Sequence, residues 1–331
     1  MDLAHDPLPG FRGLQEPARV PGTGRLWAIL LAAGEGSRVR SLTGEVGGRP
    51  VPKQFCTMDG RGSMLRWAIN RAAGIVPMER IVVIVASHHR QWWGEELADL
   101  PAANVVVQPQ NRGTGVGILL PLLSVLQRDP DARVLILPTD HYLEDEQPLR
   151  EAIVEGVRAV HTDRERVVLL GMAPQERDAE CGWILPESAS SGADHVSAFV
   201  EKPNAEKARA LARRGAVVNT LILVGTGTAM LRLYTETVPG VVEGFCDWRN
   251  EDATVWRDLE SLYDVMPVCD FSREVLERSC DHLSVVRVSG SGWMDLGTPD
   301  RLQLFRRQQV PVKAVNGPGA IVAGRRQEWR R

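Results

Sequence analysis

The chain has 331 residues, of which 44% are hydrophobic and 24% are charged, and its formal net charge at pH 7 is -3. This composition is typical of a soluble globular protein that can bury a large core. The small negative charge argues against a nucleic-acid coat protein and against a polybasic membrane surface. No apolar run approaches the roughly 18 residues that a membrane span needs.

Both ends of the chain differ in character from its body. Residues 1–25 carry charge, proline and glycine but no hydrophobic segment, which predicts a flexible extension and not a signal peptide. The folded domain is expected over 26–308, and a frayed tail over 309–331. No linker rich in glycine, proline or serine divides the body, so we expect one α/β domain with lobes.

The cysteines bear on compartment and on metal sites. Five are present, and they are scattered without a C-x-x-C pair: Cys56, Cys181, Cys246, Cys269 and Cys280. Neither a disulfide framework nor a zinc site is therefore expected. With no export signal, a reducing cytoplasm is the default compartment.

Apolar runs alternate with helix-like segments in the first half of the chain. Strands are expected at 26–32, 80–86, 105–107 and 134–138, and helices at 63–73 and 116–126. Ser63 is a plausible N-cap of the first helix and Gly74 a plausible stop. This alternation indicates right-handed βαβ units and a parallel sheet covered by helices on both faces.

The second half is less regular. Further strands are expected at 167–172, 196–200, 217–224 and 283–288, and helices at 205–214, 228–237 and 273–278. This pattern indicates a sheet continued by antiparallel insertions that build a substrate lobe.

The stretch LLAAGEGSRV, residues 30–39, follows the first strand. Gly34 and Gly36 allow a turn with free backbone N–H groups, and Arg38 adds a fixed positive fork, a combination that binds phosphate. The dinucleotide fingerprint is not met because Val39 stands at its last glycine, and the P-loop pattern is also absent. A purely structural turn is the alternative.

Two charged residues are expected near this loop. Lys53 lies in PKQF, after a proline and before a polar and an apolar residue. Its functional interpretation is a second cation beside the phosphates. Asp140 follows the strand 134–138, so it lies on the same sheet edge as the loop. A carboxylate beside a triphosphate requires a cation such as Mg²⁺ between them. The alternatives are a solvated lysine and a carboxylate that caps a turn.

Eight motifs then occur in a characteristic order: AAGEGSR, PKQF, QPQNRGTG, LPTDH, GMAPQERDAECGWI, FVEKP, VNT and GWMDLGT. Together they resemble the sugar-1-phosphate nucleotidyltransferases over residues 26–305, and PKQF and N-R-x-T resemble the mannose-1-phosphate guanylyltransferases. The resemblance implies a Rossmann-like α/β fold of the GT-A-like nucleotide-diphospho-sugar transferase type. Its mainly parallel mixed sheet is flanked by helices, and antiparallel insertions form a sugar lobe.

The resemblance also implies residue roles. Nucleotide binding falls to the loop, Lys53 and the 108–114 segment: Ala32, Ala33, Gly34, Gly36, Ser37, Arg38, Lys53, Gln108, Asn111, Arg112 and Thr114. Sugar-phosphate binding falls to Gly182, Glu201, Lys202 and Asn219, and Mg²⁺ binding to Asp140 and Asp295. The implied catalytic residues are Arg38, Lys53, Asp140, Lys202 and Asp295.

The residue chemistry agrees with these roles. Glu201 can accept hydrogen bonds from paired sugar hydroxyls, and Lys202 can face a phosphate. Because neighbouring residues of a strand point to opposite faces, one of the two should sit at a strand end or bulge. Asn219 can both donate and accept, which suits a sugar hydroxyl. The alternatives are an exposed Glu201–Lys202 ion pair and a turn carboxylate at Asp295.

The chain departs from the family pattern in three ways. Cys181 and Trp183 flank Gly182 where tyrosines are common, Leu221 stands where glycine is usual, and the loop reads AAG in place of AGG. These departures bear on the sugar more than on the reaction. His88 and His89 are interpreted as a solvated cap, and His141 receives no catalytic step.

The expected reaction joins an NTP, GTP by resemblance, to a sugar 1-phosphate, mannose 1-phosphate by resemblance, with Mg²⁺ as cofactor. The alternatives are a nucleotidyltransferase for another hexose or heptose phosphate and a non-catalytic nucleotide-sugar sensor. Nucleotide and sugar phosphate are the expected partners, without nucleic acid or membrane, and a homodimer is one option for the assembly.

Overall fold

The computed structural model of the chain describes residues 23–46, 48–58, 62–174, 180–188, 192–250 and 259–309. The expected N-terminal extension and C-terminal tail lie almost entirely outside these ranges. The described part is built on one nine-stranded sheet with the order β5-β4-β1-β6-β11-β8-β12-β10-β9.

One half of the sheet is parallel, as the sequence predicts. It consists of β1 (Leu26–Ala32), β4 (Ile81–Ala86), β5 (Val105–Gln108) and β6 (Arg133–Pro138). In the register, Leu30 of β1 lies opposite Val83 on one side and Leu137 on the other. These central strands are apolar along nearly their whole length because both of their faces are covered.

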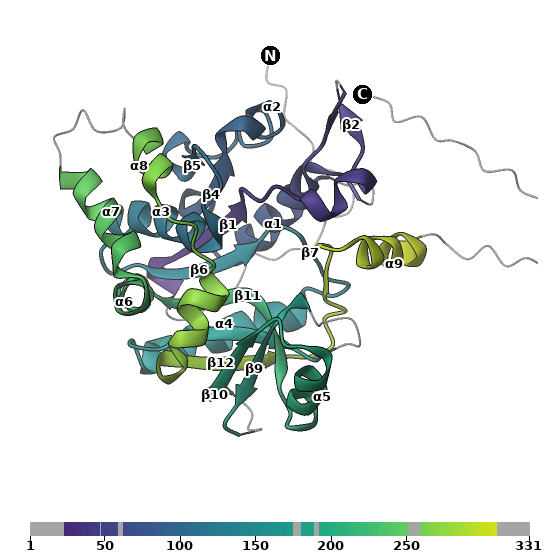
Figure 1. The fold of residues 1–331 in the computed structure, drawn as a ribbon, viewed down its shortest axis with the longest axis vertical. Coiled ribbons are helices and arrows are strands. Elements are labelled where there is room, and N and C mark those ends of the chain that lie inside the picture. Colours follow the sequence, from purple (N-terminus) through teal and green to yellow (C-terminus); the bar gives the residue numbers. More distant parts are fainter. Residues whose placement is uncertain are drawn as a thin grey trace, which may run out of the picture.

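The other half of the sheet is mixed. β11 (Val217–Thr226) runs antiparallel between β6 and β8 (Val167–Met172), and β12 (Leu283–Val288) runs parallel to β8. β9 (Gly182–Pro186) and β10 (Ala193–Glu201) form an antiparallel pair. With α5 (Ala205–Arg213), this pair forms a lobe at the end of the molecule opposite β4 and β5 (Figure 1). The expected antiparallel insertions are thus confirmed.

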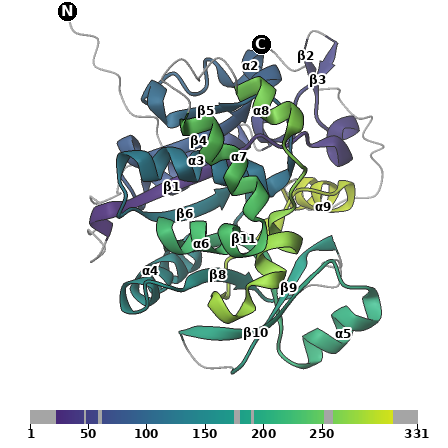
Figure 2. The same cartoon turned by 60° about the vertical axis from the view of Figure 1, so that its left-hand side comes forward.

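Helices cover both faces of the sheet (Figure 2). Leu26, Ala28 and Leu30 pack into one core with α1 (Met64–Ala73), α4 (Gln147–Thr162) and α5. Trp27 and Ile29 pack into the other with α3 (Gly113–Arg128), α6 (Gly227–Thr237) and α7 (Pro239–Asn250). This alternation along one strand is what a two-sided core requires.

Some elements differ from the expectation. Helix α3 begins at Gly113, before the predicted start, and contains Pro121. The segment predicted as a helix at 273–278 is a π-helical turn, Phe271–Val275, followed by a 3₁₀ turn, Leu276–Arg278. Further elements are η2 (Ser37–Leu42), β2 (Glu45–Val46), β3 (Arg49–Pro50), η3 (Lys53–Phe55), η5 (Ser87–His89), α2 (Arg90–Trp93), β7 (His141–Tyr142), α8 (Leu259–Val265), β13 (Met294–Asp295) and α9 (Pro299–Gln309), besides four short 3₁₀ turns, η1 (Thr23–Arg25), η4 (Met78–Arg80), η6 (Ala102–Asn104) and η11 (Cys280–His282).

Two further observations concern membrane spans and disulfides. Within the ranges that the structure describes, no helix has the length and apolarity needed to cross a bilayer. All five cysteines lie in described ranges and none is in a disulfide.

Candidate active site

The glycine-rich loop leaves β1 at the carboxyl edge of the sheet. Gly36 has φ 59°, and a Cβ on it would lie 3.2 Å from the backbone nitrogen of Lys53. A side chain there would therefore be both strained and crowded. Gln54 Nε2 donates to the carbonyl oxygens of Ala32 at 2.8 Å and Gly34 at 2.9 Å, which fixes the loop. Gln54 lies within PKQF but was not among the residues predicted for the site.

Lys53 and Asp140 form a tight ion pair beside this loop. Lys53 Nζ lies 2.5 Å from Asp140 Oδ2, and the lysine side chain is only 8% exposed. Burial alone would raise the pKa of Asp140, but the charges of Lys53 and His141 and the hydrogen bond from Lys53 lower it well below its usual range. Asp140 is therefore an ionised carboxylate across the physiological range.

Asp295 reaches the same place through a small ribbon. β13 pairs antiparallel with β7, which sets Asp295 opposite His141 and Met294 opposite Tyr142. One ligand atom from each of Asp140, His141 and Asp295 lies within 4.8 Å of the others. The two aspartates converge as a shared ion would require, while the ion itself stays a prediction.

A second buried cationic side chain, Arg301, forms an ion pair with Asp295. Arg301 Nη1 lies 3.0 Å from Asp295 Oδ2, and the arginine side chain is 7% exposed. The Gly297 N–H donates to Asp295 Oδ1 at 2.7 Å. Sequence reasoning missed Arg301, whose only signal is its place in the first turns of α9, directly after the GWMDLGT motif.

The donor set at this cluster fits a hard divalent cation. Two carboxylates provide oxygen ligands of the kind that Mg²⁺ prefers, and each oxygen keeps a lone pair beyond its present partner. His141 is buried, burial lowers its pKa, and its Nδ1 has no hydrogen-bond partner among the described residues.

The other residues predicted for the nucleotide lie at the end of β5 and the start of α3. Asn111 Oδ1 accepts from the Gly113 N–H at 2.9 Å, and Arg112 Nε donates to the Tyr263 carbonyl oxygen at 2.6 Å. Thr114 Oγ1 accepts from the backbone N–H of the π-helical turn at 3.0 Å. These side chains thus hold local structure. Gln108 differs, because its buried Oε1 has no hydrogen-bond partner in the described part of the chain.

The residues predicted for the sugar phosphate gather at β9 and β10. Gly182 pairs with Glu201, and a Cβ on Gly182 would lie 2.7 Å from Glu201 Oε2. Lys202 follows the strand with φ 47°, and its Nζ lies 3.4 Å from Glu201 Oε1. The expected strand end is therefore confirmed. Burial raises the pKa of Glu201 against the opposing effect of Lys202.

Asn219 and Leu221 lie at an irregularity of β11. The register shifts between Asn219 and Leu223, and Asn219 Oδ1 accepts from the Leu221 N–H at 3.1 Å. Leu221 has φ 57°. Glycine takes this conformation freely and leucine does not, which explains in physical terms why glycine is usual at this position.

Arg38 is placed apart from the carboxylates. It lies in η2, which begins at Ser37, and its Nη1 is 2.6 Å from Glu180 Oε2 with both side chains more than half exposed. Among the described residues, it forms no ion pair with Asp140 or Asp295. The pair joins the glycine-rich loop to the sugar lobe just before β9.

Comparison with known proteins identifies the family of this chain. The family model described as nucleotidyl transferase matches residues 27–234. The chain is 29% identical to a mannose-1-phosphate guanylyltransferase of Escherichia coli (strain K12) and 28% identical to mannose-1-phosphate guanylyltransferase ManC of Salmonella typhimurium (strain LT2), in each case over 287 residues. Each alignment covers 83% of this chain and 58% of the relative, so the chain spans less than two thirds of their length.

A solved structure supports the same assignment. A crystal structure described as a mannose-1-phosphate geranyltransferase from Thermus thermophilus superposes with a TM-score of 0.72 at 25% identity, covering 82% of this chain and 76% of that one. The expected fold class and the expected resemblance are both confirmed. The chain belongs to the nucleotidyl transferase family.

Proposed function

We propose that this chain transfers a nucleotidyl group from GTP to mannose 1-phosphate, giving GDP-mannose and pyrophosphate. The observation that carries the proposal is the meeting of the glycine-rich loop, Lys53, Asp140 and Asp295 at one sheet edge. A phosphate-binding loop beside a buried cation and two converging carboxylates suits a nucleoside triphosphate with its divalent ion.

The chemistry needs no general base. The second pKa of a phosphate monoester is about 6, so a sugar 1-phosphate is already ionised near neutral pH. The barrier is electrostatic because an anion must approach the α-phosphorus of a polyanion. Catalysis then consists of in-line alignment and neutralisation of charge.

Named residues divide this work. The backbone of the loop and Lys53 hold the triphosphate. Arg38 releases its ion pair with Glu180 and binds the departing pyrophosphate. Lys202 binds the sugar phosphate, while Glu201 and Asn219 accept from sugar hydroxyls. Asp140 and Asp295 would hold Mg²⁺, which when bound neutralises charge on the phosphates.

The choice of guanine and mannose rests on the relatives' names. One observation favours a second candidate, a nucleotidyltransferase for another hexose or a heptose 1-phosphate. Leu221 occupies a left-handed backbone position beside Asn219, where glycine is usual. We expect leucine in place of glycine to change the shape of the sugar site beside Asn219, and so the sugar that the site accepts.

The deciding experiment measures pyrophosphate release across a grid of NTPs and sugar 1-phosphates, with Mg²⁺ and with a chelator. We expect turnover with GTP and mannose 1-phosphate that requires Mg²⁺. Asp140→Asn and Arg38→Ala should each lower kcat by about a hundredfold without unfolding the protein. Turnover with a different sugar would favour the second candidate, and no turnover with any pair would overturn the proposal in favour of a nucleotide-sugar sensor.

A further inference from the structure

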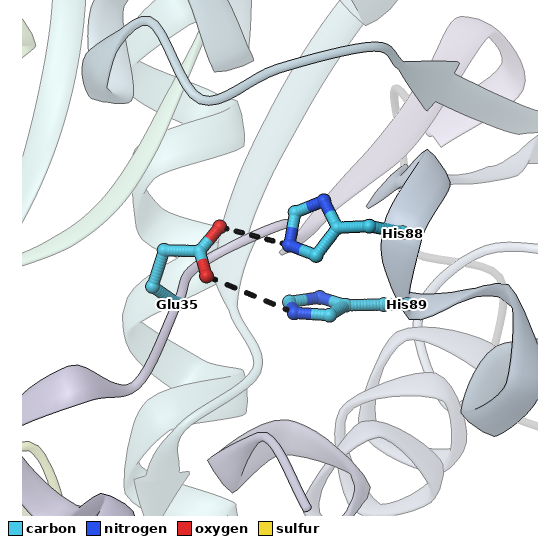
Figure 3. A group of neighbouring side chains, drawn as sticks. All are labelled: Glu35, His88 and His89. Atoms are coloured by element: carbon cyan, nitrogen blue, oxygen red, sulfur yellow. Dashed lines mark ion pairs between the residues drawn. The ribbon is translucent and has the colours of Figure 1, made fainter. Parts of the chain in front are cut away.

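Three side chains outside the carboxylate cluster converge beside the glycine-rich loop (Figure 3). Glu35 belongs to the loop, while His88 and His89 lie in η5, directly after β4. His88 Nε2 is 3.1 Å from Glu35 Oε1, and His89 Nε2 is 3.9 Å from Glu35 Oε2. One ligand atom from each residue lies within 4.8 Å of the other two.

His89 is not the solvated cap that the sequence suggested. Its side chain is 4% exposed, and its ring packs edge-on against Phe55 and Trp92, with centroids 5.9 and 5.6 Å away. Its buried Nδ1 has no hydrogen-bond partner among the described residues, and 3.9 Å is too long for a hydrogen bond from Nε2 to Glu35. A buried imidazole thus presents a nitrogen to a carboxylate without sharing a proton with it.

Burial, followed by the charge of His88, lowers the pKa of His89 to about 4. The ring is therefore neutral near pH 7 and has a lone pair to offer. A cation in the 3.9 Å gap between His89 Nε2 and Glu35 Oε2 would bind both groups. Arg40 does not fill that place, because its Nη2 lies 3.9 Å from Glu35 Oε2, beyond hydrogen-bond distance.

The separations suit a transition-metal ion. Imidazole nitrogen and carboxylate oxygen bind Zn²⁺ at about 2.0–2.2 Å, so neighbouring tetrahedral ligands lie roughly 3.3–3.6 Å apart. The distances from Glu35 oxygens to His88 Nε2 and His89 Nε2, 3.1 and 3.9 Å, fall on either side of this range. The His88 side chain is 48% exposed, which gives it room to adjust and leaves a coordination position open to solvent.

We propose that Glu35, His88 and His89 bind a divalent transition-metal ion of the zinc class, at a site separate from Asp140 and Asp295. Two imidazoles and one carboxylate favour such an ion over Mg²⁺, which prefers oxygen ligands. The cysteines had indicated no zinc site, but these histidines supply the donors instead. Because Glu35 lies between Gly34 and Gly36, the bound ion would tie the glycine-rich loop to the end of β4.

The test is a Zn²⁺ titration of the chelator-stripped full chain against a chromophoric competitor, in buffer with excess Mg²⁺. We expect His88→Gln and Glu35→Gln to weaken Zn²⁺ binding by roughly tenfold or more. His88 is exposed, so its variant should keep the far-ultraviolet dichroism and melting temperature of the wild type. His195→Gln, at another exposed histidine, is the matched control and should bind as the wild type does.

Asp295→Asn separates this proposal from the proposed function. The variant should keep Zn²⁺ binding in the presence of Mg²⁺, even if nucleotidyl transfer is lost. Co²⁺ in place of Zn²⁺ should give d–d absorption bands that disappear in His88→Gln. Equal Zn²⁺ affinity in wild type and His88→Gln, or loss of binding only in Asp295→Asn, would overturn the site and leave Glu35 and His88 as a simple ion pair.

Discussion

Replacing Lys53 with methionine should destabilise the fold chiefly by leaving the Asp140 carboxylate unpaired. Methionine keeps the volume of the side chain, so no cavity enters the comparison. In the wild type the two charged atoms are 2.5 Å apart, with the side chains of Lys53 and Asp140 8% and 32% exposed.

The magnitude follows from this burial. Breaking a fully buried ion pair from one side costs about 3–5 kcal/mol. Water at the exposed third of Asp140 offsets part of that penalty, so we expect Lys53→Met to lower the free energy of unfolding by about 2 kcal/mol at pH 7. Asp140→Asn should cost a similar amount, because it leaves the Lys53 ammonium buried without its partner.

Urea denaturation of the wild type, both single variants and the double variant provides the assay. The double variant buries neither charge, so its loss should be smaller than the sum of the single losses by about 2 kcal/mol. Without Lys53, burial raises the pKa of Asp140, so the deficit of Lys53→Met should shrink as the pH falls toward about 4. Additive single losses and a deficit independent of pH would refute this reasoning.

Three further outcomes are expected. Glu180→Gln should free Arg38 and lower the KM for NTP a few-fold, with little change in melting temperature because exposed ion pairs contribute at most about 1 kcal/mol; an unchanged KM would contradict it. Leu221→Gly should relieve about 1 kcal/mol of backbone strain and widen the range of accepted sugars, measured as ratios of kcat/KM; identical ratios would count against a role in selectivity. In the metal-free protein, His89 binds a proton only near pH 4 but near pH 6.5 when unfolded, so the free energy of unfolding should fall by up to about 3 kcal/mol from pH 6.5 to 4. Urea denaturation of His89→Phe should show a free energy of unfolding that depends less on pH. Parallel pH profiles of wild type and variant would argue that His89 is not the titrating group.

Continuous apolar strands were the part of the fold that local sequence determined well. Runs such as 26–32 and 81–86 are buried on both faces, so their pattern carries no ambiguity about which side faces the core. The π-helical turn at Phe271–Val275 was beyond such reasoning. It packs against the start of α3, where the Gly115 N–H donates to the Cys269 carbonyl oxygen at 2.8 Å. Contacts between segments this far apart leave no local pattern.

The candidate site divides in the same way. Asp140 and Lys53 could be predicted because a carboxylate after a parallel strand and a lysine close to a phosphate-type loop each suggest their own chemistry. Arg301 and Gln54 could not, because their roles depend on partners reached only through the fold. His89 shows the strongest contrast: its sequence context suggested a solvated cap, and only the packing of aromatic rings around it reveals a buried imidazole.

The pairing of each carboxylate with its own buried cation has a consequence for metal binding. Lys53 neutralises Asp140 and Arg301 neutralises Asp295, so the pocket is close to neutral before any ligand arrives. The carboxylates can then stay together without an ion, so we expect that the fold does not depend on one, unlike a structural zinc site. A lone Mg²⁺ would meet two cationic competitors at its ligands. A nucleotide carrying Mg²⁺ also brings phosphates that Lys53 can bind instead, which frees Asp140 oxygens for the ion. We therefore expect the carboxylates to bind Mg²⁺ together with the nucleotide and only weakly before it. Calorimetric titration would compare Mg²⁺ alone with Mg²⁺ in the presence of GTP. Equally tight binding of Mg²⁺ without GTP would contradict this order.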